Sequence, residues 1–309
     1  MERLTLISVV MCTFDREVMA RRTIASVYAQ RLADGHAFEM IVVDNTPDAN
    51  ARAWVESLSG LEPPLRYVHE ARSGISHARN AGVAAARGQF IAFIDDDETA
   101  EPDWLANLHR ALLAHEADMG TGPVLPVFEN KPALGWDPTP FFFGKREAMA
   151  TGGQLQAART GNIMLRVATC FDGTPPFDPR LGRSGGEDTE FTHGLYRKGR
   201  KIIWVADATV HEFWPQSKAS LPAFLRRKLV TARNTTHVRI AWAPRPVSTF
   251  LAVAVKALAQ LVVFSPLAAA SYPFSRQFYA RNAMQVMSAL GKLTFWQRAG
   301  YYGRSGGGT

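Results

Sequence analysis

Four consecutive acidic residues, at positions 95–98, follow a short apolar run in the segment GQFIAFIDDDE. Like charges side by side repel one another, so the cluster needs something of opposite charge to offset it. Closely spaced carboxylates at the end of a strand commonly bind a hard divalent cation through their oxygen atoms. The alternative is a solvated acidic segment that favours the positive end of the helix expected after Pro102.

The elements around these acids alternate between strand-like and helix-like segments, which predicts a doubly wound, mostly parallel sheet flanked by helices. Runs rich in β-branched residues alternate with segments of helical periodicity. We expect strands at 4–14, 38–46, 65–71 and 89–95, and helices at 17–30, 48–58, 74–88 and 102–116. Ligands of such sheets bind beyond the carboxyl ends of the strands, where Thr13, Asp44 and Asp95 lie.

The rest of the chain differs in composition from this alternating half. Residues 120–190 are rich in Pro, Gly and Phe, which favours loops with short strands, and from Leu221 the sequence is basic and apolar. Only two cysteines are present, too few for a disulfide framework, which indicates a reducing compartment. The first apolar run has no basic n-region or cleavage site, so we expect no signal peptide.

Charge is distributed unevenly along the 309 residues, whose 35 Lys+Arg and 28 Asp+Glu give a net charge of +7. From Arg197 onward, 17 basic residues stand against 2 acidic ones, a charge of +15 that leaves −8 for residues 1–196. No acidic residue follows Glu212. Such asymmetry indicates an acidic partner for the C-terminal part, either nucleic acid or an anionic membrane surface.

Two amphipathic helices are predicted in this basic region. The first covers 247–270, where Thr249, Lys256 and Gln260 share one face and Pro266 is expected to break the helix, which argues against a membrane crossing. In the second, a polar stripe of Arg281, Gln285, Ser288 and Lys292 lies opposite Tyr279, Ala283, Val286 and Leu290. Helices of this kind suit the plane of a membrane interface. The alternative is an ordinary helical layer packed on the rest of the protein.

Five motifs occur in the order VVMCTFDR, VVDNT, SGISHARNAG, FIDDDE and GGEDTEF. Over residues 5–215 this ordered set resembles the inverting family 2 glycosyltransferases of GT-A fold. Within that family the sequence looks similar to bacterial exopolysaccharide enzymes of the succinoglycan β-1,4-glucosyltransferase type, which share the DDDE, SGGEDT and VHE phrases. The resemblance implies transfer of one sugar from a nucleotide-diphosphate sugar, a UDP-linked hexose or N-acetylhexosamine, to a polyprenyl-diphosphate-linked glycan at the cytoplasmic face of the inner membrane.

The resemblance also implies roles for the acidic residues and their neighbours. Asp95 and Asp97 would form the D-x-D pair, with Asp97 binding Mn²⁺ or Mg²⁺ at the donor diphosphate and Asp95 near the ribose. His211 falls where many relatives place another metal ligand. The residues expected to bind the nucleotide are Thr13, Phe14, Arg16, Asp44, Arg79, Asp95 and Asp96, with Asp44 accepting a hydrogen bond from the base.

The GGEDTEF motif carries the candidate catalytic base, Asp188. An inverting transfer needs one carboxylate that deprotonates the acceptor hydroxyl as it attacks the anomeric carbon. Gly185 and Gly186 let the backbone turn tightly beside the substrate, and Glu187 either orients the acceptor or caps the following helix. The alternative is that both acids only favour the N-terminus of that helix.

The sequence departs from the family at FLRRKLVTARN, which stands where processive polysaccharide synthases have a Gln-x-x-Arg-Trp motif. The missing motif argues for addition of a single sugar. Arg226, Arg227 and Arg233 could bind a diphosphate of the donor or acceptor, because guanidinium groups suit phosphate geometry. A solvated basic helix is the alternative.

Two other functions remain open at this point. A nucleotidyltransferase uses a similar nucleotide fold and acidic metal site, although GGEDTEF favours sugar transfer. A basic protein that binds nucleic acid is the non-enzymatic alternative, but the basic part has long apolar faces and no recognisable binding motif, so we expect no nucleic acid partner. We predict a catalytic domain at 1–220, with a nucleotide-binding half at 1–119 and an acceptor-side half at 120–220, and a helical membrane-associating region at 221–309.

Overall fold

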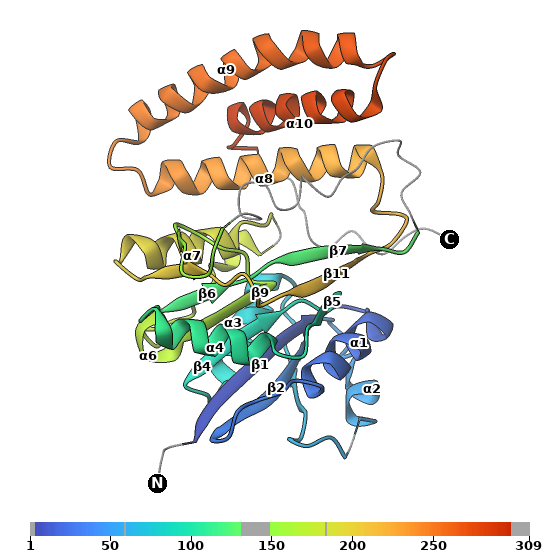
Figure 1. Ribbon diagram of the computed structural model, residues 1–309, viewed down its shortest axis with the longest axis vertical. Helices are drawn as coiled ribbons and strands as arrows, with labels where there is room; N and C mark the ends of the chain where they lie inside the picture. The colour runs from blue at the N-terminus through green and yellow to red at the C-terminus, as the bar shows by residue number, and fades with distance from the viewer. Residues whose placement is uncertain (1–3, 59, 131–148, 183, 298–309) are drawn as a thin grey trace.

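The computed structural model describes residues 4–58, 60–130, 149–182 and 184–297. Eight strands form its main sheet in the order β3-β2-β1-β4-β9-β6-β10-β8. The first four strands in this order are parallel, and helices connect them along the chain (Figure 1). These strands are β1 (Thr5–Thr13), β2 (His36–Asp44), β3 (Arg66–His69) and β4 (Phe90–Ile94), joined by α1 (Glu17–Tyr28), α2 (Arg52–Glu56) and α3 (Ile75–Ala85). The predicted doubly wound, mostly parallel sheet is confirmed, although α2 is shorter than the helix expected at 48–58.

The continuous run of apolar residues in β1 explains why this strand lies inside the sheet. It pairs with β2 on one side and β4 on the other, and Ile7, Val9, Val10 and Met11 are fully buried. A strand covered by helices on both faces reads as a continuous apolar run instead of an alternating one. The polar residue at its end, Thr13, therefore reaches the carboxyl edge of the sheet beside the end of β2.

The other half of the sheet mixes strand directions. Strand β9 (Asn162–Arg166) is antiparallel to both neighbours, β4 and β6 (Met119–Thr121). The remaining strands are β10 (Ile202–Trp204) and β8 (Gln154–Leu155), and the helices of this half are α4 (Trp104–Ala114), α6 (Val167–Cys170), η2 (Pro179–Leu181) and α7 (Glu187–Arg197). The loops with short strands predicted for 120–190 match the described part of that segment.

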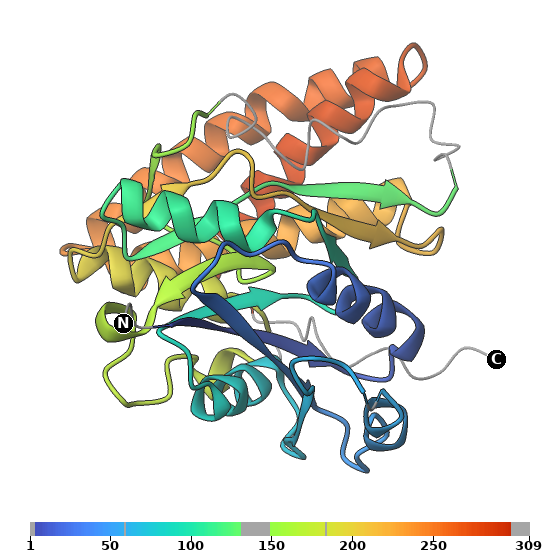
Figure 2. The ribbon, with the colours of Figure 1, turned by 60° about the horizontal axis from the view of Figure 1, so that its bottom comes forward.

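A second, three-stranded sheet has the order β5-β11-β7. Strand β5 (Glu98–Ala100) starts at the last of the four acids and pairs with β11 (Val210–Trp214), which runs beside β7 (Val124–Phe128) in both views (Figures 1 and 2). The backbone N–H of Phe213 donates to the carbonyl of Asp97 at 2.7 Å. This sheet therefore fixes the acids against a segment more than a hundred residues later in the chain.

Three long helices form a layer over the sheets: α8 (Leu221–Ala241), α9 (Pro246–Ser271) and α10 (Arg276–Leu293). Helix α8 lies next to α7, and α10 lies between α8 and the outermost helix, α9 (Figure 1). The packing of α8 on α10 is close, because a Cβ on Gly291 would lie 2.5 Å from the carbonyl oxygen of Leu229.

The prediction that Pro266 breaks the first of the amphipathic helices is wrong, because α9 continues through Pro266 to Ser271. Proline removes one backbone donor, but here it does so near the C-terminal end of the helix, where few hydrogen bonds follow. Among the described residues, one helix, α9, has the length and the apolar composition needed to cross a membrane.

Part of the polar stripes of α9 and α10 joins the two helices, whereas Lys256 and Arg281 are exposed. Nε2 of Gln260 donates to Oε1 of Gln285 at 3.3 Å, and Nζ of Lys292 donates to Oε1 of Gln260 at 2.6 Å. Gln260, Gln285 and Lys292 therefore lie between the two helices, and the place of these helices in the plane of a membrane interface stays a prediction. The apolar face of α9 points outward, with exposed fractions of 47–75% at Val247, Leu251, Val255, Leu258, Val262, Val263 and Leu267.

Candidate active site

The acidic loop, defined here as residues 95–98, makes a tight turn between β4 and β5. The N–H of Asp95 donates to Oε2 of Glu98 at 3.0 Å, and the N–H of Glu98 donates to the carbonyl of Asp95 at 3.1 Å. Burial raises the pKa of Glu98 well above its usual range, and the charge of Asp95 adds to the rise. Burial likewise raises the pKa of Asp95 to about 6 against the opposing charge of Arg79, although its side chain stays 46% exposed. The loop concentrates negative charge that a cation would relieve.

Basic side chains from two other segments reach the middle of the acidic loop. Nη1 of Arg16 contacts Oδ1 of Asp96 at 2.9 Å and Oδ2 of Asp97 at 3.1 Å, and Thr13 Oγ1 donates to Asp96 at 2.9 Å. Nζ of Lys218 lies 3.5 Å from Oδ2 of Asp97. Asp96 is thus tied to the end of β1, and Asp97 lies between two cations. The predicted roles of Thr13, Arg16 and Asp96 toward a nucleotide stay predictions.

Arg79 joins the two acidic motifs of the sequence. Its side chain is buried on α3, where Nη1 contacts Oε1 of Glu187, 108 residues away in sequence, and Nη2 lies 3.5 Å from Oδ1 of Asp95. Oε2 of Glu187 is buried and has no hydrogen-bond partner among the described residues. Burial raises the pKa of Glu187, and the charge of Arg79 opposes that rise. Arg79 is therefore a bridge between the acidic loop and α7.

Asp188, the predicted base, lies in the first turn of α7 next to the buried Glu187. Its Oδ1 accepts hydrogen bonds from N and Oγ1 of Thr189 at 2.6 Å and 3.1 Å, and the residue is only partly buried. Positioned in the turn, Asp188 can meet an incoming acceptor, whereas Glu187 is enclosed. The roles of Asp188 as the base and of Glu187 toward the acceptor stay predictions.

The turn before α7 depends on glycine. Gly185 and Gly186 have φ values of 77° and 99°, in the left-handed region that other residues rarely adopt. A Cβ on Gly186 would also lie 3.0 Å from Cβ of Asn234 on α8. The predicted tight turn is therefore present, and it brings α8 against the GGEDTEF motif.

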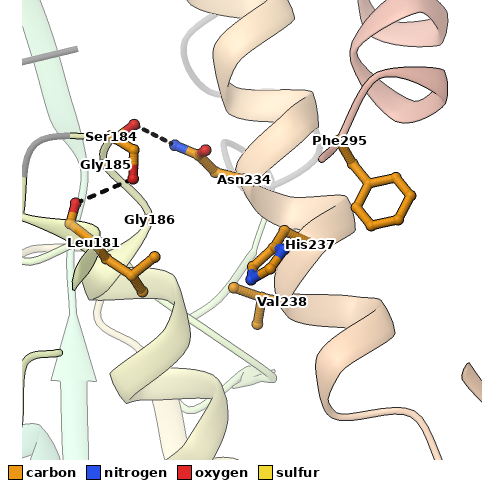
Figure 3. A pocket seen from close by; sticks show the side chains of 8 residues that line it. All are labelled: Leu181, Ser184, Gly185, Gly186, Asn234, His237, Val238 and Phe295. Carbon is orange, nitrogen blue, oxygen red and sulfur yellow. Dashed lines mark hydrogen bonds between the residues drawn. The ribbon is translucent and has the colours of Figure 1, made fainter. Parts of the chain in front are cut away.

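A small pocket separates this turn from α8 (Figure 3). Nδ2 of Asn234 donates across it to the carbonyl of Ser184 at 3.3 Å. The pocket is lined by Leu181, Ser184, Gly185, Gly186, Asn234, His237, Val238 and Phe295. Its volume of about 10 Å³ suits a single water molecule. The pocket joins the helical layer to the GGEDTEF motif without providing room for a sugar.

Asp44 is fully buried at the end of β2. Its carboxylate accepts hydrogen bonds from four donors of the protein at 2.7–2.9 Å: N and Oγ1 of Thr46, N of Ala51 and the hydroxyl of Tyr67. These contacts shape the loop after β2. Contact between Asp44 and a nucleotide base stays a prediction, as does that of Phe14, which is 39% exposed beyond β1.

His211 and Glu212 point to opposite faces of β11, as successive residues of a strand do. Nε2 of His211 contacts Oε1 of Glu101 at 2.6 Å. Glu212 pairs in register with Glu98, and its charge contributes to the raised pKa of both Asp95 and Glu98. A metal-binding role for His211 stays a prediction, and the residue that faces the acidic loop is Glu212. The alternation within VHEFW was the available signal for Glu212.

The three arginines of α8 lie in different places. Nη1 of Arg227 lies 3.4 Å from Oε1 of Glu212, and its guanidinium covers the ring of Trp214 at 4.9 Å. Arg226 is exposed. Arg233 donates from Nε to Oγ1 of Thr294 at 2.9 Å, which ties α8 to the end of α10. Of the three, Arg227 is the one that the structure brings toward the acidic loop.

The acidic loop has the donor chemistry for a hard cation but lacks a complete set of ligands. No group of three His, Cys, Asp or Glu side chains arranged to hold a metal occurs in the described ranges. Gly161 leaves space beside the loop, since a Cβ there would lie 3.0 Å from Oδ2 of Asp95 and 2.6 Å from Oε1 of Glu98. The residues fit Mn²⁺ or Mg²⁺ if a bound diphosphate supplies further oxygen ligands.

Solved structures with the same fold define the class. GalNAc-T7, crystallised with UDP, GalNAc and Mn²⁺, superposes with a TM-score of 0.61 at 18% identity, covering 83% of this chain and 51% of its own. TarS 1-349 of S. aureus, crystallised with UDP, superposes with a TM-score of 0.54 at 14% identity, covering 94% of this chain and 92% of its own. The chain thus has the GT-A fold of nucleotide-sugar-dependent glycosyltransferases, as the motifs predicted.

Sequence comparison then gives the family. The model described as glycosyl transferase family 2 matches residues 8–171, and the model of glycosyl transferase family group 2 matches residues 90–296. The succinoglycan biosynthesis protein ExoM of Rhizobium meliloti (strain 1021) is 34% identical over 235 residues, which cover 76% of this chain and 74% of ExoM. The protein belongs to the family 2 glycosyltransferases, and the resemblance to succinoglycan-type enzymes is confirmed.

Proposed function

We propose that this glycosyltransferase moves a single sugar, with inversion, from a UDP-linked hexose or N-acetylhexosamine to a polyprenyl-diphosphate-linked glycan during exopolysaccharide or cell-surface glycan synthesis. The observation that carries the proposal is the Arg79 bridge, which holds the α7 motif beside the acidic loop. The similarity to a succinoglycan biosynthesis protein supports the pathway class, and the UDP-bound structures of the same fold support the donor class.

The division of labour follows from burial and charge. Asp188 accepts the proton of the acceptor hydroxyl, because it is the more open of the two acids at the start of α7. Glu187 and Arg79 form an enclosed ion pair that fixes the turn carrying Asp188. Arg16 and Lys218 contact Asp97 and can share the negative charge of a diphosphate bound beside it.

A divalent cation, Mn²⁺ or Mg²⁺, is part of the proposal. Asp95 and Asp97 would hold it, together with oxygens of the donor diphosphate. When bound, the cation stabilises the charge that develops on the leaving diphosphate. It would also offset the mutual repulsion within the acidic loop, where burial first and then the charges of Asp97 and Asp96 raise the pKa of Asp95.

The helical layer supports a location at a membrane surface. The outward face of α9 carries large apolar side chains with exposed fractions as high as 75% at Val262 and 74% at Val247. A contiguous exposed apolar face indicates a partner that buries it. An anionic inner-leaflet surface would bury this apolar face and would also present a lipid-linked acceptor. We therefore propose that the enzyme lies at the cytoplasmic face of the inner membrane, with residues 221–309 as its membrane-associating region.

A panel of nucleotide sugars tests the activity. The protein is incubated with each donor, Mn²⁺ and a lipid-linked acceptor fraction, and release of the nucleoside diphosphate is measured. We expect release from one or a few UDP-sugars that requires Mn²⁺ or Mg²⁺ and disappears in Asp188→Asn. Formation of inorganic diphosphate from a nucleoside triphosphate and a sugar phosphate, with no cleavage of any nucleotide sugar, would instead identify a nucleotidyltransferase.

A further inference from the structure

A second cavity lies within the helical layer, away from the acidic loop. It is a partly open cavity lined by α8, α9 and α10, with a volume of about 250 Å³. We call it the basic cavity, and its lining is Lys228, Thr231, Ala232, Thr235, Thr236, Arg239, Val253, Lys256, Ser288 and Lys292.

The basic cavity gathers positive charge, and no acidic side chain occurs among its described lining residues. Lys228, Arg239, Lys256 and Lys292 all line it, and the sequence contains no acidic residue after Glu212. Burial lowers the pKa of Lys292, and the charges of Lys228, Arg239 and Lys256 lower it further. Uncompensated like charges around one space repel one another, and an anion in that space removes the repulsion.

The lining has the donors that a phosphate group requires. Ser288 and Thr236 are 9% and 5% exposed and lie deep within the helical layer, whereas Arg239 and Lys256 are exposed at its surface. Ammonium, guanidinium and hydroxyl groups are all hydrogen-bond donors, and charge-assisted bonds to phosphate are among the stronger ones. Among the lining residues, no side chain is a carboxylate that would compete for the cations.

Position links the basic cavity to the helix that carries the exposed apolar side chains. Lys256 lies on α9, which also carries exposed apolar side chains such as Leu258 and Val262. Burial lowers the pKa of Lys228, and the charge of Arg159 lowers it further. Arg159 precedes Gly161 by two residues. Gly161 lies against Asp95 and Glu98.

We propose that the basic cavity binds the phosphate or diphosphate group of a membrane lipid, with the lipid chains outside α9 and the head group among Lys228, Arg239, Lys256 and Lys292. If the proposed function is correct, this lipid is the acceptor carrier. The inference then assigns acceptor binding to residues outside the catalytic motifs and outside Arg226, Arg227 and Arg233.

The test compares two charge-matched double variants of the full chain. Arg239→Gln with Lys256→Gln removes two exposed cations of the basic cavity. Arg276→Gln with Arg281→Gln removes two exposed cations of α10 that do not line it, and therefore measures non-specific attraction. A third variant, Thr235→Glu, keeps every cation and adds a carboxylate at an exposed lining position. Circular dichroism verifies that each variant is folded.

Binding is measured without any sugar donor, so the result does not depend on catalysis. Inorganic diphosphate is titrated by calorimetry with a chelator present, which removes metal-dependent binding at the acidic loop. The same proteins are then floated with phosphatidylcholine vesicles, with and without phosphatidic acid. We expect the Arg239/Lys256 double variant and Thr235→Glu to weaken diphosphate binding about tenfold or more. The Arg276/Arg281 double variant should weaken it about twofold or less. The variants should follow the same order in their binding to phosphatidic acid vesicles.

Two results would overturn the proposal. Equal losses in the two charge-matched pairs would mean that diphosphate senses only the overall charge of the helical layer. Diphosphate binding that follows the expected order, without that order on phosphatidic acid vesicles, would mean a site for free phosphate compounds and not for lipid. Loss of donor cleavage in the nucleotide-sugar panel, with the binding order intact, would contradict only the proposed function.

Discussion

The α/β part and the helical layer place charged and apolar side chains in opposite ways. Around the sheets, Ile7 and Leu108 are fully buried and cations pair with acids, as Arg79 does with Glu187. In the helical layer, Leu258 is 54% exposed, while Lys228 and Lys292 face an inner cavity without acidic partners. The first arrangement suits a protein surrounded by water. The second suits a layer with an apolar environment outside and an anionic ligand inside.

The largest effect is expected on turnover, from a substitution in the α/β part at the start of α7. Asp188→Asn removes the proton acceptor and keeps nearly the same shape, so turnover should fall by about 10²-fold or more while donor affinity is retained. Initial rates and donor titration measure the two quantities. Glu190→Gln, two residues further along α7, is the control and should keep turnover within a few-fold of the unchanged enzyme. Turnover of Asp188→Asn at that same level would exclude Asp188 as the base.

Metal-dependent donor binding should be the next most sensitive property. Asp97→Ala removes a carboxylate that would hold the cation, so the affinity for UDP in the presence of Mn²⁺ should fall about 10–100-fold. The control is Asp103→Ala, which removes an exposed acid that contacts Arg31 at 2.7 Å. Calorimetry with and without Mn²⁺ measures the effect. An unchanged Mn²⁺ dependence in Asp97→Ala would contradict the metal assignment.

One identical substitution in each region sharpens the comparison further. Leu108→Ala opens a cavity in the core and should lower the free energy of unfolding by roughly 2–5 kcal/mol. Leu258→Ala removes an exposed side chain of α9 and should change it by about 0.5 kcal/mol or less, while weakening attachment to vesicles. Chemical denaturation and flotation measure the two properties. A loss of several kcal/mol in Leu258→Ala would mean that the outward face of α9 is buried by protein.

The smallest expected effect is a pH dependence at the acidic loop. The pKa of Asp95 rises from 3.8 to about 6 on folding, so the folded chain holds this proton more tightly than the unfolded chain. Without metal, its contribution to the free energy of unfolding is therefore lost as pH rises through this window. A divalent cation binds the ionised carboxylate, so Mn²⁺ should raise the melting temperature by a few degrees at about pH 7.5 and little at about pH 5. Asp95→Asn should reduce this difference, and an equal Mn²⁺ effect at both pH values would contradict the account.

Much of the α/β part could be predicted because its signals are local. The run before Thr13 and the run before Asp95 each specify a buried strand, and a parallel sheet brings their carboxyl ends to one edge. The Arg79–Glu187 contact could not be predicted in this way, since it joins residues 108 positions apart. Glu212 was missed because His211 was considered as a single residue instead of one position in an alternating strand.

The helical layer was harder to predict because a helical stripe does not indicate what it faces. The spacing of Lys256 and Gln260 correctly places them on one side of a helix, but Gln260 contacts α10 whereas Lys256 is exposed. A helix that packs in a three-helix layer and a helix that lies in lipid show the same periodicity of apolar residues. The contacts of Gln260 with Gln285 and Lys292 show that this side chain points toward α10.

The membrane location of the helical layer is tested most directly by co-sedimentation of the full chain with neutral and anionic vesicles, each at low and high salt. Each Lys or Arg near an anionic surface contributes about 1 kcal/mol, which salt screens, whereas apolar burial is insensitive to salt. We expect strong sedimentation with anionic vesicles at low salt and a weaker but measurable fraction at high salt. Equal and negligible sedimentation in all four conditions would contradict the account, because the exposed face of α9 would then have no affinity for lipid.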